Sequence, residues 1–346
     1  MRQDWKGKPY YSLDCYCKET FGEKLYKIAL DGGFTCPNRD GTAGYGGCIF
    51  CSHGGSGEFA VPVEVSADRK KSDGQKATGN EYSDRKAAID IGREIRKGIS
   101  LFHEKKTGDK FIAYFQAYTG TYDRPERLYS LYHAALSHDK IAGVSIATRP
   151  DCLGNEVLNV LAGLQAEFPA KFIWIELGLQ TVHEDTAAYI RRGYKLPVFE
   201  KAAADLRALG IPFIVHTILG LPGENLERIL ETVHYINQIK PFGIKLQLLY
   251  ILKDTDLAAD YERGLVPVYS KEEYLRTLLA CITRLNPHIV VHRITGDGPK
   301  NLLIAPKWSL NKRDVLNSFH KLCRETVGFQ GKYYENNESQ ECTGEI

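Results

Sequence analysis

The chain has 346 residues, of which 43% are hydrophobic and 25% charged, and its formal net charge is +2. These values are typical of a globular protein with one large α/β domain and appendages, or with two domains. They exclude a strongly basic protein, and no apolar run approaches the roughly 18 residues of a membrane span. Nine cysteines, an odd number in a chain of this size, favour metal binding in a reducing compartment over a disulfide framework. We therefore expect a cytoplasmic protein that does not enter the membrane.

The chain begins with an aromatic and charged stretch, residues 1–26, which predicts an N-terminal extension that packs against the main domain. A glycine-rich segment at residues 31–57 follows a short apolar run and contains Cys36, Cys48 and Cys51. Two thiolates in a C-x-x-C spacing can share a metal centre, and a third can close on them across a flexible loop. Three protein ligands leave one position of a four-coordinate site open, so this spacing indicates room for a cofactor or substrate.

A structural zinc site is the alternative for the same segment. In that case His53 or Cys15 would supply the fourth ligand of a closed tetrahedral site, and the protein would be a scaffold rather than an enzyme.

After a polar stretch at about residues 61–83, which predicts a mobile loop, patterns of buried strands alternate with amphipathic helices. Strands are predicted at residues 28–30, Phe111–Phe115, Val144–Ala147, Phe172–Leu179, Phe213–Leu219 and Ile244–Leu249. Helices are predicted at Arg85–His103, Pro125–Ser137, Glu156–Glu167, Pro197–Leu209 and Asn225–Ile239. This alternation is typical of βαβ crossovers, which build a parallel sheet buried on both faces.

Six such units are too few for a closed eightfold barrel. We therefore expect an α/β fold in which residues 27–255 form a partial, open TIM-type (β/α)6 barrel. Residues 256–346 would form a small C-terminal α/β appendage with a basic tail. The appendage would contain a helix at Lys271–Leu285 and a strand-like run at Ile289–Ile294.

Polar residues gather where the predicted strands end, and ligands of parallel α/β folds bind at those ends. Gln116 and Tyr118 follow the second strand, Glu176 and Gln180 lie on the fourth, and His216 lies on the fifth. Simpler roles remain open. Glu176 would pair with one of the arginines at positions 149 and 192, and His216 would be a hydrogen-bonded histidine near the core.

The order of the motifs resembles the radical S-adenosylmethionine (radical SAM) superfamily, in particular the branch related to the Elongator catalytic subunit. Within that branch the chain is most similar to a stand-alone bacterial subgroup with the pattern CPNRDGT…GGCIFC. The other shared motifs are IATRPDCL (146–153), ELGLQT (176–181), RRGY (191–194) and ILGLPGE (218–224). The eleven residues between Cys36 and Cys48 depart from the usual C-x3-C-x2-C spacing, and a glycine-rich loop can still bring the three sulfurs together.

This resemblance implies that Cys36, Cys48 and Cys51 each bind one iron of a [4Fe–4S] cluster, whose fourth iron binds SAM. The reduced cluster would cleave SAM to methionine and a 5′-deoxyadenosyl radical, which abstracts hydrogen from a C–H bond. The residues implied to contact SAM are Gln116, Tyr118, Glu176, Gln180, Arg192, His216 and Leu219.

The resemblance also implies a substrate. Elongator-type relatives modify wobble uridine in tRNA, so we expect modification of a uridine side chain, with an electron donor such as flavodoxin or ferredoxin. Acetyl transfer is not expected, because no room for an acetyltransferase domain follows residue 300. Residues 300–332 carry seven Lys or Arg against two acids, an excess that suits either phosphate contacts or an ordinary solvated surface. The alternative substrate is a small metabolite, as in porphyrin-type radical SAM enzymes.

Overall fold

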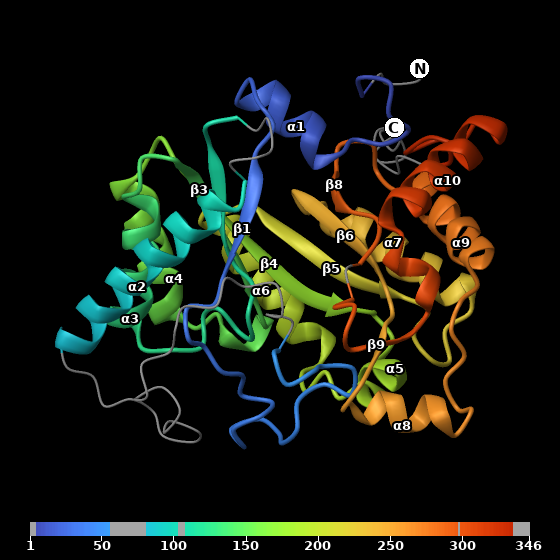
Figure 1. The fold of residues 1–346 in the computed structure, drawn as a ribbon, viewed down its shortest axis with the longest axis horizontal. Coiled ribbons are helices and arrows are strands. Elements are labelled where there is room, and N and C mark those ends of the chain that lie inside the picture. The colour runs from blue at the N-terminus through green and yellow to red at the C-terminus, as the bar shows by residue number, and fades with distance from the viewer. Residues whose placement is uncertain (1–4, 56–80, 103–107, 297, 335–346) are drawn as a thin grey trace, which may run out of the picture.

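The structure is a computed structural model that describes residues 5–55, 81–102, 108–296 and 298–334. Its centre is a seven-stranded sheet, β1-β2-β3-β4-β5-β6-β8, in which every neighbouring pair is parallel. The sheet curls into an open half-barrel (Figure 1), which confirms the predicted partial barrel. Its strands are β1 (Tyr26–Leu30), β2 (Phe111–Phe115), β3 (Ile141–Thr148), β4 (Phe172–Gln180), β5 (Phe213–Leu219), β6 (Gly243–Leu248) and β8 (Val290–Arg293).

The seventh strand corrects the predicted count of six. The strand-like run at Ile289–Ile294 forms β8, which pairs with β6 and extends the main sheet rather than belonging to a separate appendage. The barrel sheet therefore continues past the predicted boundary at residue 255. Beyond β6, a small antiparallel pair forms from β7 (Ile251–Leu252) and β9 (Leu303–Ala305).

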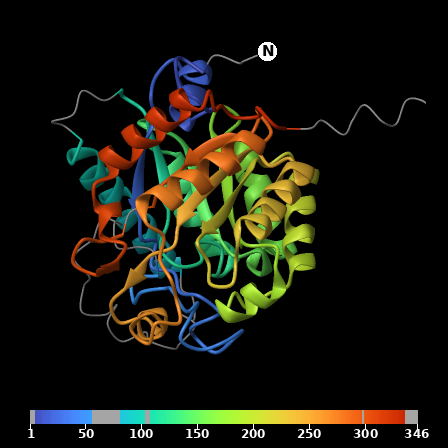
Figure 2. The same cartoon turned by 90° about the vertical axis from the view of Figure 1, so that its right-hand side faces the viewer.

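Helices cover the convex face of the sheet (Figure 2), as βαβ crossovers require. The five helices predicted between the strands form α2 (Glu81–Ser100), α3 (Pro125–Leu136), α4 (Asn155–Glu167), α6 (Leu196–Ala208) and α7 (Leu226–Ile239), and the helix predicted in the appendage forms α9 (Lys271–Arg284). Four helices were not predicted: α1 (Leu13–Thr20), α5 (Glu184–Tyr189), α8 (Asp256–Glu262) and α10 (Lys312–Glu325). Short 3-10 turns lie at Pro150–Cys152 and Lys307–Leu310.

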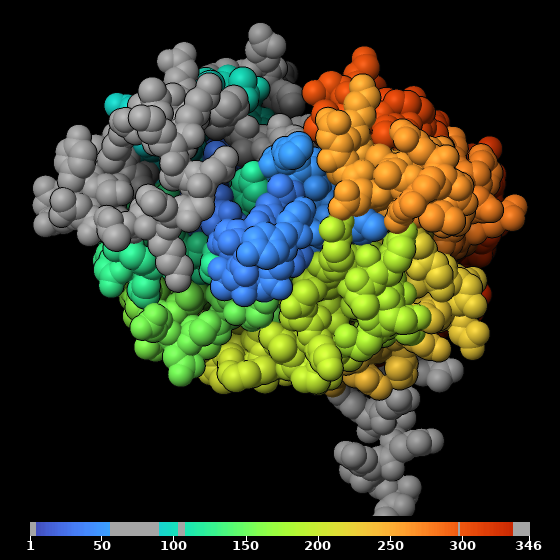
Figure 3. All heavy atoms as spheres, turned by 90° about the horizontal axis from the view of Figure 1, so that it is seen from below, coloured from blue at the N-terminus to red at the C-terminus, as the bar shows by residue number. Residues whose placement is uncertain are grey.

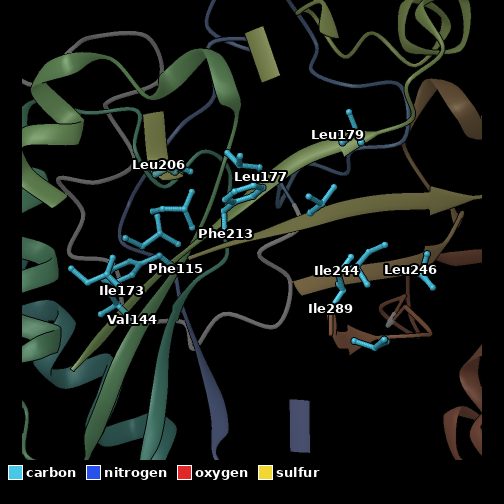
Figure 4. Close-up of a cluster of buried hydrophobic side chains, with 14 of the residues drawn as sticks. Phe115, Val144, Ile173, Leu177, Leu179, Leu206, Phe213, Ile244, Leu246 and Ile289 are labelled. Atoms are coloured by element: carbon cyan, nitrogen blue, oxygen red, sulfur yellow. The ribbon is translucent and has the colours of Figure 1, made fainter. Parts of the chain in front are cut away.

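Alternation along the strands divides the sheet into an outer and an inner face. Side chains on the outer face pack against the helices and form the main core. Figure 4 shows part of this core, including Ile173, Leu177 and Leu179 of β4. The alternate residues of β4, among them Trp174 and Glu176, point into the half-barrel. Packing on the outer face therefore stabilises the fold, whereas the inner face is available to bind a ligand.

The amino-terminal end of the barrel interior is closed by aromatic side chains. Tyr16 from α1 packs edge-on against Phe242 with ring centroids 4.9 Å apart, and Trp174 stacks on Phe172 at 3.9 Å. The N-terminal stretch also pairs with the sheet, because Val291 of β8 donates its backbone N–H to the carbonyl of Tyr11 at 2.7 Å. Through these contacts the described part of the N-terminal stretch packs on the sheet and plugs one end of the barrel.

The loop predicted at residues 61–83 lies outside the described residues up to residue 80, and its last three residues belong to α2. Among the helices that are described, none is both long and apolar enough to cross a membrane.

Candidate active site at the carboxyl ends of the strands

The three motif cysteines lie in the loop that follows β1. This loop lies at the carboxyl ends of the strands (lower part of Figure 1). Cys36, Cys48 and Cys51 are thiols that form no disulfide, and all three are partly buried. Burial, together with the nearby thiols of Cys51 and Cys36, raises the pKa of the Cys48 thiol to about 12. The fold therefore brings the three sulfurs into mutual electrostatic range across the long gap.

Glycines give the cysteine loop its shape. Gly46 and Gly47, immediately before Cys48, have φ angles of 75° and 81°, a left-handed conformation that other residues adopt only with strain. Gly55 is also left-handed, and a Cβ atom there would lie 2.3 Å from the ring of Tyr118. The loop thus needs glycine both to turn back toward Cys36 and to approach the end of β2.

A second apolar cluster anchors the same loop to the rest of the fold. Ile49, between the last two cysteines, donates its N–H to Ile190 at 3.2 Å and accepts from the N–H of Leu257 at 3.0 Å. Its side chain packs with Leu221 and Ile251 in a small core built from α5, α8 and the β7–β9 pair. Figure 3, seen from the carboxyl ends of the strands, shows the loop in the middle of this face, flanked by residues of α5 and α8. The unpredicted short helices therefore hold the cysteine loop over the barrel.

Tyr118 supports the cysteine loop directly. Its hydroxyl donates to the carbonyl of His53, and its N–H donates to the carbonyl of Gly55 at 2.9 Å. The guanidinium of Arg39 lies 5.5 Å from its ring centroid and also donates to the carbonyls of Cys51 and Ser52. The geometry gives Tyr118 a positioning role for the loop, while its predicted contact with SAM stays a prediction.

Below the cysteine loop, the inner face of the sheet is reached by solvent. On otherwise buried strands, the inward residues near the carboxyl ends are partly exposed, and we call the space that they line the inner hollow: Ala29, Gln116, Ala147, Gly178, His216, Ile218 and Gln247. Three of these seven residues are Ala or Gly, and their small side chains leave room for a ligand beneath the loop.

At the floor of the inner hollow, where His216 belongs to both levels, every strand of the sheet contributes one inward polar side chain. We call this set the polar ring: Lys27 (β1), Tyr114 (β2), Ser145 (β3), Glu176 (β4), His216 (β5), Lys245 (β6) and Arg293 (β8). Glu176 is its centre, with a fully buried side chain. The ring separates the inner hollow from the aromatic plug.

The Glu176 carboxylate accepts four hydrogen bonds. At Oε1 the donors are the ammonium of Lys27 and the hydroxyl of Ser145, the latter at 2.6 Å. At Oε2 they are Nε2 of His216, at 2.7 Å, and the ammonium of Lys245. The alternative that Glu176 pairs with the arginine at position 149 or 192 is wrong, because its lysine partners are Lys27 and Lys245.

The ring perturbs the protonation of its members. Burial alone would raise the pKa of Glu176, but the ammonium groups of Lys245 and Lys27 hold it well below its usual value. Burial, reinforced by Lys245, lowers the pKa of His216 to about 4. Glu176 is therefore a carboxylate and His216 a neutral imidazole at neutral pH. Since Nε2 of His216 donates to Glu176, its Nδ1 is left as a hydrogen-bond acceptor.

Arg192 is almost fully buried, and protein groups hold its guanidinium. It donates to the carbonyls of Leu179 at 3.0 Å, Thr181 at 2.7 Å and Tyr194 at 2.9 Å. These bonds favour a role in shaping the end of β4, and the predicted contact of Arg192 with SAM stays a prediction. Gln180 lies beside it on the bulge that ends β4, where the hydroxyl of Tyr194 donates to its Oε1 at 3.3 Å.

The remaining predicted residues divide between the two faces. Gln116 and His216 lie on the inner face, whereas Leu219 is 2% exposed and belongs to the outer core. The structure thus does not bring Leu219 to the inner hollow, where its neighbour Ile218 lies instead. Sequence reasoning missed Lys27 and Lys245, although a single lysine inside an apolar strand is itself a signal of a buried polar partner.

The donor groups suit the implied cofactors. Three thiols in one loop match the thiolate ligands of a [4Fe–4S] cluster, and the inner hollow beneath them suits an organic ligand. In the described parts of the chain, no three His, Cys, Asp or Glu side chains are placed to hold a single metal ion. A [4Fe–4S] cluster does not require such a group, because each thiolate binds a different iron. Cys15, one candidate for the zinc site, instead lies buried in α1, where its thiol donates to Glu19 at 3.1 Å.

Comparison with known families gives two matches. Residues 36–236, more than half of the chain, match the model of the radical SAM superfamily. Residues 241–325 match the model of the radical SAM C-terminal domain. The first match begins at Cys36, the first of the three motif cysteines.

Among individual proteins, YtqA of Bacillus subtilis is 39% identical over 333 residues, which are 96% of this chain and 95% of YtqA. A tRNA uridine(34) acetyltransferase of Methanocaldococcus jannaschii is 23% identical over 168 residues, which are 48% of this chain and 30% of that enzyme. A structure of Elp3 from the archaeon Methanocaldococcus infernus has a TM-score of 0.59 at 17% identity, over 70% of this chain and 60% of that one. The structural likeness shows a shared fold.

Proposed function

Because this chain belongs to the radical SAM superfamily, whose members bind a [4Fe–4S] cluster and SAM, we propose that it modifies a side chain of the wobble uridine in tRNA. The family match favours a radical SAM enzyme over the zinc-binding scaffold. The observation that carries the proposal is the loop of Cys36, Cys48 and Cys51 held over the inner hollow. The tRNA part rests on likeness to a tRNA uridine(34) acetyltransferase over about half of this chain.

When bound, the cluster and SAM supply reductive cleavage of SAM and removal of a hydrogen atom from a substrate C–H bond. The protein's own residues bind and orient. Cys36, Cys48 and Cys51 would hold the cluster, and Tyr118 and Arg39 would fix their loop. Such chemistry also needs exclusion of water, which the aromatic plug provides at the amino-terminal end of the barrel.

In this proposal the inner hollow holds SAM. His216 offers a neutral acceptor, Nδ1, which suits a ribose hydroxyl, and Gln116 offers a side-chain amide at the end of β2. The predicted roles of Glu176 and Arg192 become indirect: Glu176 orients His216, and Arg192 shapes the end of β4.

The basic stretch at residues 300–332 would contact the RNA backbone. Six of its seven basic residues are exposed, and the stretch runs from β9, near the cysteine loop, to α10 at the other end of the molecule (Figure 1). A basic surface that extends away from the site suits a substrate much larger than the reacting base. The proposed enzyme is cytoplasmic and takes electrons from a donor such as flavodoxin or ferredoxin.

Mass spectrometry of tRNA nucleosides tests the function. Cells that lack the protein should accumulate one wobble uridine in an incompletely modified form. Purified protein with reconstituted cluster, SAM and dithionite should convert that tRNA to the mature form. An unchanged nucleoside profile, together with no salt-dependent affinity for tRNA, would contradict the proposal and favour a small-metabolite substrate.

A further inference from the structure

The carboxamide of Asn38 lies against the sulfur of one motif cysteine. Asn38 follows Cys36 by two residues in the cysteine loop, and it is only 4% exposed. Its Nδ2 lies 3.6 Å from Sγ of Cys48 and 2.7 Å from the backbone carbonyl oxygen of Arg191. A carboxamide nitrogen carries two hydrogens, so it can donate one to each acceptor. One hydrogen thus ties the loop to the segment after α5, and the other is directed at the sulfur.

The surroundings of the carboxamide fix its orientation. A carbonyl oxygen accepts hydrogen bonds, so the group that lies 2.7 Å from the carbonyl of Arg191 must be the nitrogen and not Oδ1. On the other side, Oδ1 faces Gly44 and Gly193, where added Cβ atoms would lie 2.6 Å and 3.1 Å from it. Because two glycines and a carbonyl enclose the group, its second N–H stays directed at Cys48.

The backbone holds this donor and its acceptor sulfur together. The carbonyl of Asn38 accepts a hydrogen bond of 2.8 Å from the N–H of Gly47, the residue before Cys48. The residue after Cys48, Ile49, donates its N–H to the carbonyl of Ile190 at 3.2 Å. Both sides of Cys48 are therefore tied to the same two segments that hold the carboxamide.

An N–H donor at a ligand sulfur changes the electron affinity of an iron–sulfur cluster. Reduction adds negative charge, part of which resides on the sulfur ligands, and hydrogen bonds to sulfur are one of the factors that set the potential. A hydrogen bond strengthens as its acceptor becomes more negative, so it stabilises the reduced form more than the oxidised form. The partly buried loop adds to this effect, because electrostatic interactions are stronger where water is scarce.

From this geometry we propose that Asn38 is a positioning residue that raises the reduction potential of the [4Fe–4S] cluster through its hydrogen bond to Sγ of Cys48. The proposal rests on the proposed function, in which the three loop cysteines hold the cluster. One electron passes from the donor protein to the cluster, while Asn38 keeps its protons and its bonds. Asn38 thereby makes the cluster easier to reduce.

Redox titration of the anaerobically reconstituted protein without SAM, followed by the electron paramagnetic resonance signal of the reduced cluster, tests the proposal. Asn38→Ala removes the donor, and it should lower the equilibrium constant for reduction about tenfold, which corresponds to about 59 mV for one electron. Asn38→Asp removes the same donor and places a carboxylate beside the sulfur, so it should lower the potential further.

The sign of the change separates this role from a purely structural one. A loop that is merely loosened admits water, which stabilises the added charge of the reduced cluster and raises the potential. Thr42→Val provides a matched control in the same loop, because it removes a hydrogen bond of 2.8 Å between the hydroxyls of Thr42 and Tyr122. This variant should keep the equilibrium constant for reduction within about twofold of wild type.

A second measurement observes the hydrogen bond in the wild-type protein. Protein labelled with ¹⁵N in the side-chain amide of asparagine would be studied by pulsed electron paramagnetic resonance of the reduced cluster. We expect a ¹⁵N coupling to the cluster, and we expect Asn38→Ala to lose it. Because the wild-type spectrum alone detects the contact, this result also holds if the variants bind no cluster.

An unchanged or raised potential in Asn38→Ala, or the absence of an asparagine ¹⁵N coupling in wild type, would overturn the proposal. If wild type binds the cluster and Cys48→Ala does not, these results leave the assignment of the cysteines in place. Wild-type protein that binds no cluster after reconstitution would instead overturn that assignment, and the role of Asn38 with it.

Discussion

His216 shows how one residue obtains its chemical state from its neighbours. Its Nε2 lies 2.7 Å from Oε2 of Glu176, which fixes the proton on that nitrogen, and burial beside Lys245 lowers its pKa to about 4. The imidazole is therefore neutral, with Nδ1 as an acceptor. A neutral acceptor can serve a ribose hydroxyl without adding a buried charge.

The pKa of His216 predicts a pH dependence of stability. Its ordinary value is 6.5 and its folded value about 4, so between these values the unfolded chain binds a proton that the folded chain does not. The free energy of unfolding should therefore fall as the pH drops from about 6.5 to about 4. Across the whole interval, this difference in pKa lowers the free energy of unfolding by about 3 kcal/mol.

Urea unfolding at about pH 7 and about pH 4.5 measures this effect. His216→Gln removes the titrating group. Between these two pH values its free energy of unfolding should therefore fall by about 2 kcal/mol less than that of wild type. His234→Gln, which changes an exposed histidine on α7, should keep the wild-type difference. Equal losses in wild type and His216→Gln would refute the assigned protonation state.

Individual ring residues were the hardest to predict from the sequence. Lys27, Ser145 and Lys245 lie alone within apolar runs, where a linear pattern gives no partner. Their common target, Glu176, lies 149 residues from Lys27 and 69 from Lys245, so only the curl of the open sheet brings them together. The three cysteines could be predicted from the sequence because their motif is local in the chain.

At the scale of elements, the contact between α2 and β1 shows why a helix keeps a glycine. Gly98 lies in the last turn of α2, and a Cβ atom there would come within 2.2 Å of Cγ2 of Ile28, which is 1% exposed. Gly163 on α4 has no neighbour within 4 Å of such a Cβ atom. The first glycine permits close packing of a helix on the sheet, and the second has no such role.

Alanine substitutions at these two glycines should change the stability of the protein in opposite directions. Gly98→Ala overpacks the helix–strand contact and should destabilise the protein by about 1–3 kcal/mol. Gly163→Ala should stabilise it by about 0.5–1 kcal/mol, because alanine restricts the unfolded chain and favours the helix. The two transition midpoints in a urea titration measure both effects. Stabilisation by Gly98→Ala would show that α2 does not pack this closely on β1.

The elements differ in how well the sequence predicts them. Strands such as β2 and β5 were placed correctly because both of their faces are buried and their apolar runs are continuous. The six-residue α5 is too short for a helical period to emerge. By contrast, α10 buries Val315, Phe319 and Cys323 at helical spacing, a signal present in the sequence and overlooked among its basic residues.

At the scale of the whole molecule, four groups of residues follow one another along the axis of the half-barrel. Aromatic residues close the amino-terminal end, the polar ring lies in the middle, the inner hollow follows, and the cysteine loop covers the carboxyl ends. Each level is built from alternate residues of the same strands. The sequence predicted the two ends of this axis, since the cysteine motif and the N-terminal aromatics are contiguous. Of the levels between them it predicted Gln116, Glu176 and His216, but not the lysines that surround Glu176.

The central claim is that the three loop cysteines hold a [4Fe–4S] cluster that cleaves SAM. The direct test is the iron content and the 5′-deoxyadenosine yield of anaerobically reconstituted protein with dithionite and SAM. Wild type should bind about four irons and form 5′-deoxyadenosine. Cys48→Ala should lose both properties while it keeps the wild-type circular dichroism, and Cys152→Ser, which changes the thiol that follows Asp151 near Cys36, should keep both. A colourless wild-type protein with one zinc, or a Cys48→Ala variant that still cleaves SAM, would contradict the account.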